Sequence, residues 1–201
     1  MKRLLLTGSQ AVPHFIGSWE SHDHSLCDAV VDFFEANKRR QSPGTMTSGT
    51  NFEGKRSTDL TVNPGDLEMA GFEPLMKYVL GLFECFQDYG AQWPFLKSEM
   101  GDLDVGPFNI QKYSVGDHFS RVHAERTNLS TAHRALAWMT YLSDVEEGGV
   151  TSFPHFDIEV PPEKGKTMIW PSDWTHAHQG RPVKAGVKYI VTGWLHYPHD
   201  E

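Results

Sequence analysis

The sequence predicts a mainly β fold with flanking helices. Its second half breaks into short β-prone runs that turn residues separate at close spacing. Helical periodicity is confined to two segments that both precede residue 95. The 201 residues suffice for one full core and are too few for two comfortable domains. We therefore expect one domain over residues 1–201, with helical support at about 20–95 and a β core at about 105–198.

Two helices are expected in the first half. The first follows a candidate cap, Ser25, and runs to about Arg40, and the second runs from Pro74, well placed in a first turn, to about Tyr89. Their inward residues recur at helical spacing: Leu26, Ala29, Val30, Phe33 and Phe34 in the first, and Leu75, Tyr78, Val79, Leu82, Phe83 and Phe86 in the second.

A polar segment, residues 41–63, separates the two helices. It is rich in Gly, Ser and Thr, and its only expected strand is 58–62. Such a length is unusual for a connection within one domain. The sequence leaves two interpretations open, a loop that faces a substrate and a disordered loop.

Eight short runs in the second half have β character and no helical segment between them. They predict two packed antiparallel sheets. The expected strands are 108–114, 118–123, 134–142, 150–153, 158–160, 166–170, 175–180 and 189–196.

Composition argues against several classes of partner. The net charge of -8 offers no footprint for nucleic acid, and Lys38–Arg40 complements the end of the first helix. Cys27 and Cys85 fall on the apolar stripes of the helices, which indicates reduced core thiols and a reducing compartment. The apolar run Met1–Leu6 is too short for a signal peptide, and no stretch approaches a membrane span. We expect a cytoplasmic protein without nucleic-acid or membrane partners, and the oligomeric state stays open.

His123-Ala124-Glu125 is the strongest chemical signal. Residues two apart on an extended strand share one face, so both side chains can reach one ion. A second imidazole from a distant strand, His178, would complete two histidines and one carboxylate, the ligand set of non-haem Fe(II) oxygenases with three open positions. His176 competes with His178, because the two would point to the same strand face.

An ordered series of motifs surrounds these residues. It comprises Gln111–Phe119, His123–Glu125, Arg134, Tyr141–Asp144, Glu147–Phe153, Pro161, Lys164–Gly165 and His178–Tyr189. Over roughly the last half of the chain this series resembles the prolyl 4-hydroxylase branch of the 2-oxoglutarate and Fe(II)-dependent dioxygenases. The resemblance implies a double-stranded β-helix of the jelly-roll or cupin type. One departure stands out: the branch has His-x-Asp, and this chain has His-x-Glu, which keeps the charge but adds one methylene.

The resemblance also implies roles for individual residues. His123, Glu125 and His178 would bind the metal, and the offsets of Pro182 and Lys188 favour His178 over His176. Lys188 would bind the far carboxylate of 2-oxoglutarate, since a cation among apolar residues needs an anionic partner. The candidates that would help to hold or enclose this co-substrate are Tyr113, Tyr141, Thr151 and the pocket wall Trp194, and simple core packing is the alternative for all four. No catalytic residue beyond the metal ligands is expected.

The implied activity is hydroxylation of a prolyl residue in a protein or peptide. Fe(II), 2-oxoglutarate and O2 would be required, ascorbate is a candidate reductant, and succinate and CO2 are the co-products. Hydroxylation of a free amino acid or another small molecule is the enzymatic alternative. A non-catalytic cupin-like binding protein is the alternative of another class, but such a protein has no need of Lys188.

Overall fold

The computed structural model describes residues 1–4, 13–21, 23–46 and 49–197. Nine strands of this described part form the main sheet, in the order β1-β2-β12-β8-β15-β6-β4-β3, with β5 paired to β15. The bounds are β1 Lys2–Leu4, β2 Gly17–Glu20, β3 Gln41–Pro43, β4 Thr58–Val62, β5 Asp104–Val105, β6 Phe108–Tyr113, β8 Arg134–Tyr141, β12 Lys166–Pro171 and β15 Lys188–His196.

The small sheet has the strand order β11-β10-β13-β7, and every pairing in it is antiparallel. Strands β9 and β14 form a further antiparallel pair. The bounds are β7 Phe119–His123, β9 Glu147–Gly148, β10 Thr151–Phe153, β11 Ile158–Val160, β13 His178–Gly180 and β14 Val183–Ala185. The predicted mainly β class with packed antiparallel sheets is confirmed.

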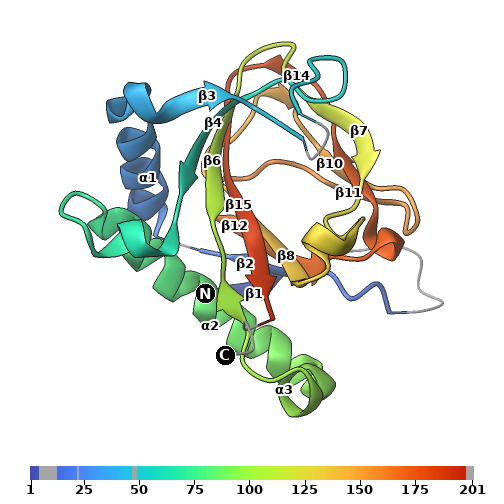
Figure 1. The fold of residues 1–201 in the computed structure, drawn as a ribbon. Helices are drawn as coiled ribbons and strands as arrows, with labels where there is room; N and C mark the ends of the chain where they lie inside the picture. Colours follow the sequence, from blue (N-terminus) through green and yellow to red (C-terminus); the bar gives the residue numbers. More distant parts are fainter. Residues whose placement is uncertain (5–12, 22, 47–48, 198–201) are drawn as a thin grey trace.

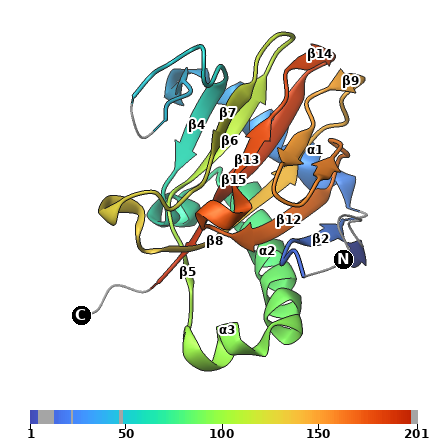
Figure 2. The same ribbon diagram turned by 90° about the vertical axis from the view of Figure 1, so that its right-hand side faces the viewer.

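The helices lie against the face of the main sheet that is turned away from the small sheet (Figures 1 and 2). The two long ones, α1 and α2, contact each other and share one core with the sheet. The helical segments are α1 His24–Ala36, α2 Glu73–Gln92 and α3 Pro94–Glu99, with the 3-10 turns η1 Lys38–Arg40, η2 Pro64–Glu68, η3 Leu129–Thr131 and η4 Trp174–His176.

Strand β8 shows how the main sheet separates two cores. Leu136 and Trp138 pack with the helices, whereas Ala137 and Met139 pack with residues of the small sheet. Successive side chains of a strand point to opposite faces, so a strand buried on both faces reads as a continuous apolar run. The helices therefore close one face of the main sheet, and the other face remains available for a site between the sheets.

Several predicted boundaries differ from the observed ones. The expected strand 175–180 is wrong in its first half, because 174–176 form the turn η4 and β13 begins only at His178. The helix expected to reach Arg40 ends at Ala36 and continues as η1. The division into helical and β parts is also too simple, since β1 to β4 join the main sheet from the first 62 residues.

Cys27 and Cys85 are buried and unpaired, as predicted. Burial raises the pKa of the Cys27 thiol to about 11 and that of Cys85 to about 12, so both are protonated at neutral pH. Among the described residues, no helix is both long and apolar enough to cross a membrane. The run Met1–Leu6 lies partly outside the described residues.

Candidate metal centre

The pairing of two strands brings the distant histidine to the site. His123 ends β7, His178 begins β13, and the two residues are direct partners in the antiparallel register. Glu125 lies beyond the end of β7, so the expectation that it shares a strand with His123 is wrong. Its backbone N–H donates instead to the carbonyl of Ser172, which follows β12, and this bond turns Glu125 back toward the histidines.

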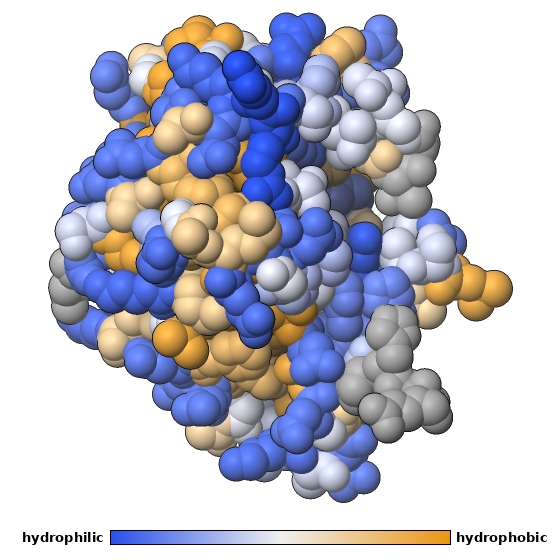
Figure 3. All heavy atoms as spheres, turned by 60° about the vertical axis from the view of Figure 1, so that its left-hand side comes forward, coloured by the Kyte–Doolittle hydropathy of each residue, from blue (hydrophilic) through white to orange (hydrophobic). Residues whose placement is uncertain are grey.

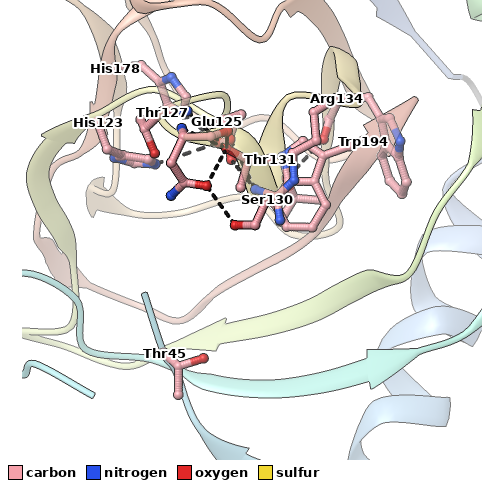
Figure 4. Close-up of polar contacts among 12 residues, drawn as sticks. Thr45, His123, Glu125, Thr127, Ser130, Thr131, Arg134, His178 and Trp194 are labelled. Carbon is pink, nitrogen blue, oxygen red and sulfur yellow. Dashed lines mark hydrogen bonds and ion pairs between the residues drawn. The ribbon is translucent and has the colours of Figure 1, made fainter. Parts of the chain in front are cut away.

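His123, Glu125 and His178 point toward one another in Figure 4. One ligand atom from each lies within 4.8 Å of the other two. Glu125 Oε1 is 3.7 Å from His123 Nε2 and 3.4 Å from His178 Nε2. Two imidazoles and a carboxylate at this separation fit a divalent transition metal with open positions on the remaining side.

Each histidine presents the same ring nitrogen to the centre. The Nδ1–H of His123 donates to the Arg121 carbonyl at 2.8 Å, and that of His178 donates to the His176 carbonyl at 3.0 Å, because a carbonyl can only accept. Both Nε2 atoms are consequently left with a lone pair. A backbone partner on the second ring nitrogen is the usual way in which a metal-binding histidine is oriented.

The charge states suit a metal site at neutral pH. Burial, reinforced by nearby His178, lowers the pKa of His123 to about 4, so its imidazole is neutral. Burial alone would raise the pKa of Glu125, but its interactions with His178, His123 and the Trp194 N–H lower it to about 2, so its carboxylate is ionised. The centre therefore offers the neutral imidazole of His123 and the ionised carboxylate of Glu125.

Glu125 is held by its second oxygen. Trp194 Nε1–H donates to Glu125 Oε2 at 2.8 Å, and Arg134 donates to the Glu125 carbonyl at 3.1 Å. The Arg134 guanidinium carbon lies 3.6 Å from the centre of the Trp194 ring, which stacks the two side chains. Because Oε2 is engaged, Oε1 is the oxygen that faces the histidines, and we expect Glu125 to bind a metal through one oxygen.

Trp194→Phe tests this arrangement. The ring is kept and only the N–H donor is lost, so we expect metal affinity to fall about ten-fold, within the ten- to hundred-fold range for partners of metal ligands. Mn(II) titration by calorimetry measures the change. Trp174→Phe is the matched control, since Trp174 lines the same cavity but is 71% exposed and has no bond to a ligand. Equal affinities for the parent and Trp194→Phe would contradict the assigned role.

His176 is not a competing ligand in this geometry. Its Nε2 lies 2.8 Å from the His14 carbonyl and donates to it, which directs the ring away from Glu125. The argument that His176 and His178 share a strand face was wrong, because His176 belongs to η4.

Lys188 begins β15 and is 3% exposed. Its Nζ donates to the Gly149 carbonyl at 3.1 Å and lies 4.4 Å from the centre of the Tyr113 ring. Among the described residues no carboxylate pairs with it. Burial lowers the pKa of Lys188 to about 8, which leaves a cation that an anionic ligand would stabilise.

The pKa of Lys188 predicts a pH dependence. Below about pH 8 the amine is charged and attracts the far carboxylate of 2-oxoglutarate; above it the free protein loses this charge. We expect the apparent Kd for 2-oxoglutarate, measured with Mn(II) in place of Fe(II), to rise as the pH passes about 8. Lys188→Arg, which stays charged, should show a flatter profile. Parallel profiles for the two proteins would exclude Lys188 as the titrating group.

The other predicted pocket residues differ in position. Tyr113, Thr151 and Trp194 line the same cavity as His123, Glu125, His178 and Lys188. Tyr141 does not line it: its hydroxyl lies 2.6 Å from Thr151 Oγ1 and 3.1 Å from the Val160 carbonyl, behind Thr151. Its place favours a role in orienting Thr151 over direct contact with a ligand.

A buried polar network beside Tyr113 was not predicted from the sequence. Lys55 Nζ lies 2.7 Å from Asp59 Oδ2, which also accepts from Gln111 Nε2 at 3.0 Å, and the Tyr113 hydroxyl donates to Gln111 Oε1 at 2.7 Å. These residues come from β4, β6 and the preceding loop. A signal was present in retrospect, since polar Gln111 lies on the same strand face as Tyr113.

The candidate metal ligands, Lys188 and the polar network beside Tyr113 all border one cavity of about 940 Å³ between the two sheets. Segment 42–46 contributes Ser42, Pro43, Thr45 and Met46 on the side away from the histidines, where Figure 4 places Thr45. Of the two interpretations of residues 41–63, this favours a loop that faces a substrate.

One family model matches the strand-rich second half of the chain. Residues 108–196 match the model of the 2OG-Fe(II) oxygenase superfamily. The matched residues make up a little under half of the chain, and over them the chain is similar to this superfamily. The matched residues include His123, Glu125, His178 and Lys188.

Several curated relatives to which the chain is similar are prolyl 4-hydroxylases. Prolyl 4-hydroxylase subunit alpha-1 of Homo sapiens is 36% identical over 116 residues, covering 49% of this chain and 22% of that subunit. Probable prolyl 4-hydroxylase 4 of Arabidopsis thaliana is 25% identical over 202 residues, covering 85% of this chain and 63% of that protein. The chain thus spans only about a fifth of the length of the alpha subunits it matches.

A solved structure supports the fold. The prolyl hydroxylase of Trichoplax adhaerens, determined in complex with a peptide fragment of the hypoxia inducible factor oxygen degradation domain, has a TM-score of 0.68. The match covers 92% of this chain and 84% of the Trichoplax adhaerens chain, and the two sequences are 16% identical. The predicted double-stranded β-helix is confirmed.

Proposed function

We propose that this chain is an Fe(II)- and 2-oxoglutarate-dependent oxygenase that hydroxylates a prolyl residue in a protein or peptide. One observation carries the proposal: two histidines, a carboxylate and a buried unpaired lysine border the same cavity. The first three suit Fe(II), and the fourth suits the far carboxylate of a dicarboxylate co-substrate.

Each residue of the site would have a distinct role in this reaction. His123, Glu125 and His178 hold the metal, with Trp194 and Arg134 orienting Glu125. Lys188 binds the far carboxylate, and Thr151, oriented by Tyr141, offers a hydroxyl beside it. Tyr113 supports Lys188 with its ring, because its own proton is donated to Gln111.

When bound, Fe(II) with 2-oxoglutarate and O2 would supply the oxidative decarboxylation to succinate and CO2 and the hydroxylation of an unactivated C–H bond. The chain itself orients the target and limits water. Phe119 stacks on His123 with ring centres 3.7 Å apart, and Trp170 lies edge-on to His178 at 5.1 Å, so both ligands have apolar cover.

A peptidyl substrate is favoured over a free amino acid by the relatives, which are named prolyl 4-hydroxylases, and by the size of the cavity. A free amino acid or another small molecule is the alternative substrate. The geometry argues against a non-catalytic binding protein, which would not require an unpaired buried lysine beside a metal site.

Mass spectrometry tests the proposal. Proline-containing peptides are incubated with the protein, Fe(II), 2-oxoglutarate and ascorbate, and the expected product has gained one oxygen atom on proline while succinate accumulates in equal amount. His178→Ala, which removes a ligand, is the inactive control. Oxygen incorporation into free amino acids only would replace the peptidyl substrate with a small molecule. Absence of succinate under every condition would contradict the oxygenase.

Three accompanying expectations belong to the same proposal. Residues 1–201 form one catalytic domain, ascorbate serves as reductant, and the protein acts in the cytoplasm without nucleic-acid partners. The buried cysteines, which form no disulfide, support a reducing compartment, and the net charge of -8 argues against a nucleic-acid partner.

A further inference from the structure

The cavity carries a charge opposite to that of the chain. Its described lining includes four cations, Lys55, Arg121, Arg134 and Lys188, and two anions, Asp59 and Glu125. A divalent metal and a dicarboxylate would cancel each other, so the loaded cavity keeps an excess of two positive charges (four minus two). This excess stands within a protein whose net charge is -8. A substrate that brings negative charge would therefore be attracted.

Three of the four cations are already engaged. Lys55 pairs with Asp59 at 2.7 Å, and both side chains are buried. Lys188 faces the co-substrate under the proposed function. Arg134 is stacked on Trp194 and bonded to the Glu125 carbonyl. Arg121 differs, because its backbone is bonded but its guanidinium has no ion pair or hydrogen bond with any residue in the described part of the chain.

The position of Arg121 relates it to the reacting end of the cavity. Phe119, Arg121 and His123 alternate along β7 and share the face that lines the cavity. Two residues along a strand correspond to about 7 Å, so the backbone of Arg121 lies that far from the candidate ligand His123. Its N–H donates to Gly54 at 3.2 Å, which places it where the loop before β4 meets β7. The long side chain is exposed at this junction.

Two exposed apolar residues belong to the cavity lining as well. Val122 is 50% exposed and Trp174 is 71% exposed, and both line the cavity. The aromatic face and the free guanidinium offer separate contacts for an apolar and an acidic side chain of one extended segment. Figure 3 shows apolar side chains gathered also on the side of the molecule that carries α1, but nothing indicates an occupant there.

We propose that Arg121 is a specificity determinant that selects peptide segments with an acidic side chain close to the residue to be hydroxylated. This inference rests on the proposed function for the existence of a peptidyl substrate. A cation about two strand positions from a metal ligand reaches a side chain one to three residues away from a target held at the metal. The recognised chemistry is a carboxylate on an extended peptide.

Peptides that differ in one charge test the inference. Each contains one proline with Glu, Gln or Lys two residues away on either side. Binding is measured by fluorescence anisotropy in the presence of 2-oxoglutarate and with Mn(II) in place of Fe(II), and hydroxylation is measured separately by mass spectrometry. We expect the Glu peptide to bind about three- to ten-fold more tightly than the Gln peptide, and the Lys peptide to bind most weakly, with differences that shrink as salt is added.

Variants assign the preference to Arg121. Arg121→Gln should bind the Glu and Gln peptides equally, and Arg121→Glu should prefer the Lys peptide. Arg39→Glu is the matched control, because it makes the same change in net charge at an exposed position outside the cavity and should leave the preference intact. An unchanged preference for Glu in Arg121→Glu, or equal binding of all peptides by the parent, would overturn the inference.

The two measurements keep this inference separate from the proposed function. Hydroxylation of all three peptides at equal rates and equal affinities would retain the proposed function and exclude the role of Arg121. Arg121-dependent binding of the Glu peptide without hydroxylation would retain the role of Arg121 and contradict the proposed reaction. Turnover of free amino acids with no peptide binding would overturn both.

Discussion

Lys188→Ala is expected to raise the KM for 2-oxoglutarate about ten- to a hundred-fold while leaving metal affinity nearly unchanged. The substitution removes one charge-assisted bond worth roughly 1.5 to 3 kcal/mol, which corresponds to that range. Lys188 is 3% exposed, whereas every other described cation at the cavity either has a bonding partner or is exposed to solvent. Steady-state kinetics with varied 2-oxoglutarate measure the KM, and a Mn(II) titration measures the metal affinity.

Lys184→Ala is the matched control for this result. Lys184 is also close to β15 in sequence, but it is exposed, pairs with Glu147 at 3.0 Å and lies outside the cavity. Its KM should equal that of the parent. Thermal unfolding of Lys188→Ala should be measured as well, because the Lys188 stem packs beside Gly149. An unchanged KM in a folded Lys188→Ala protein would assign the far carboxylate to another cation, such as Arg134, which also lines the cavity.

Strand periodicity was the part of the fold that the sequence could predict. The apolar run Arg134–Tyr141 is buried on both faces, and the run 108–114 has its strand at Phe108–Tyr113, because long strands between two cores leave a readable pattern. Lys188 and Trp194 are six residues apart on β15, so they share a strand face, and both line the cavity. The alternation of side chains along a strand can be recognised within a short stretch of sequence, so the face that each residue occupies could be predicted.

The missed elements depend on contacts between distant segments. Strand β2 has only four residues, Gly17–Glu20, and exists because it pairs with β12 nearly 150 residues later. The turn η4 replaced an expected strand because His176 is tied to the His14 carbonyl. No window of sequence contains both partners, so neither element could be predicted from local pattern.

The candidate centre was also predicted only in part, because some of its contacts join segments that are distant in the sequence. Sequence spacing singled out His123 and Glu125, although for a reason that the structure corrects: Glu125 reaches the site through the bond of its N–H to Ser172. Trp194 was expected only as a wall, yet its N–H is bonded to Glu125. Arg121 was not singled out at all, because an arginine on a strand is ordinary until its neighbours are known to line a cavity.

Glu125→Ala is expected to cause the largest loss of all the substitutions considered. It deletes a charged donor from the proposed ligand set and leaves Trp194 Nε1 without its acceptor. Loss of a mere partner of a ligand costs ten- to a hundred-fold in affinity or activity, so loss of the ligand should exceed about a hundred-fold in Mn(II) affinity. Turnover of 2-oxoglutarate at saturating Fe(II) should fall to background.

Glu125→Asp is expected to be impaired but less severely, although it restores the His-x-Asp pattern. The backbone of Glu125 is fixed by its bond to Ser172, and Trp194 holds Oε2 at the reach of a glutamate. An aspartate would end about one C–C bond, roughly 1.5 Å, short of both Trp194 and the point that faces His123 and His178. We therefore expect a ten- to hundred-fold loss for Asp and a larger one for Ala, measured as Mn(II) affinity and as turnover. If the Asp variant equals the parent and the Ala variant also keeps its metal, Glu125 is not a ligand and the site must be built around other groups.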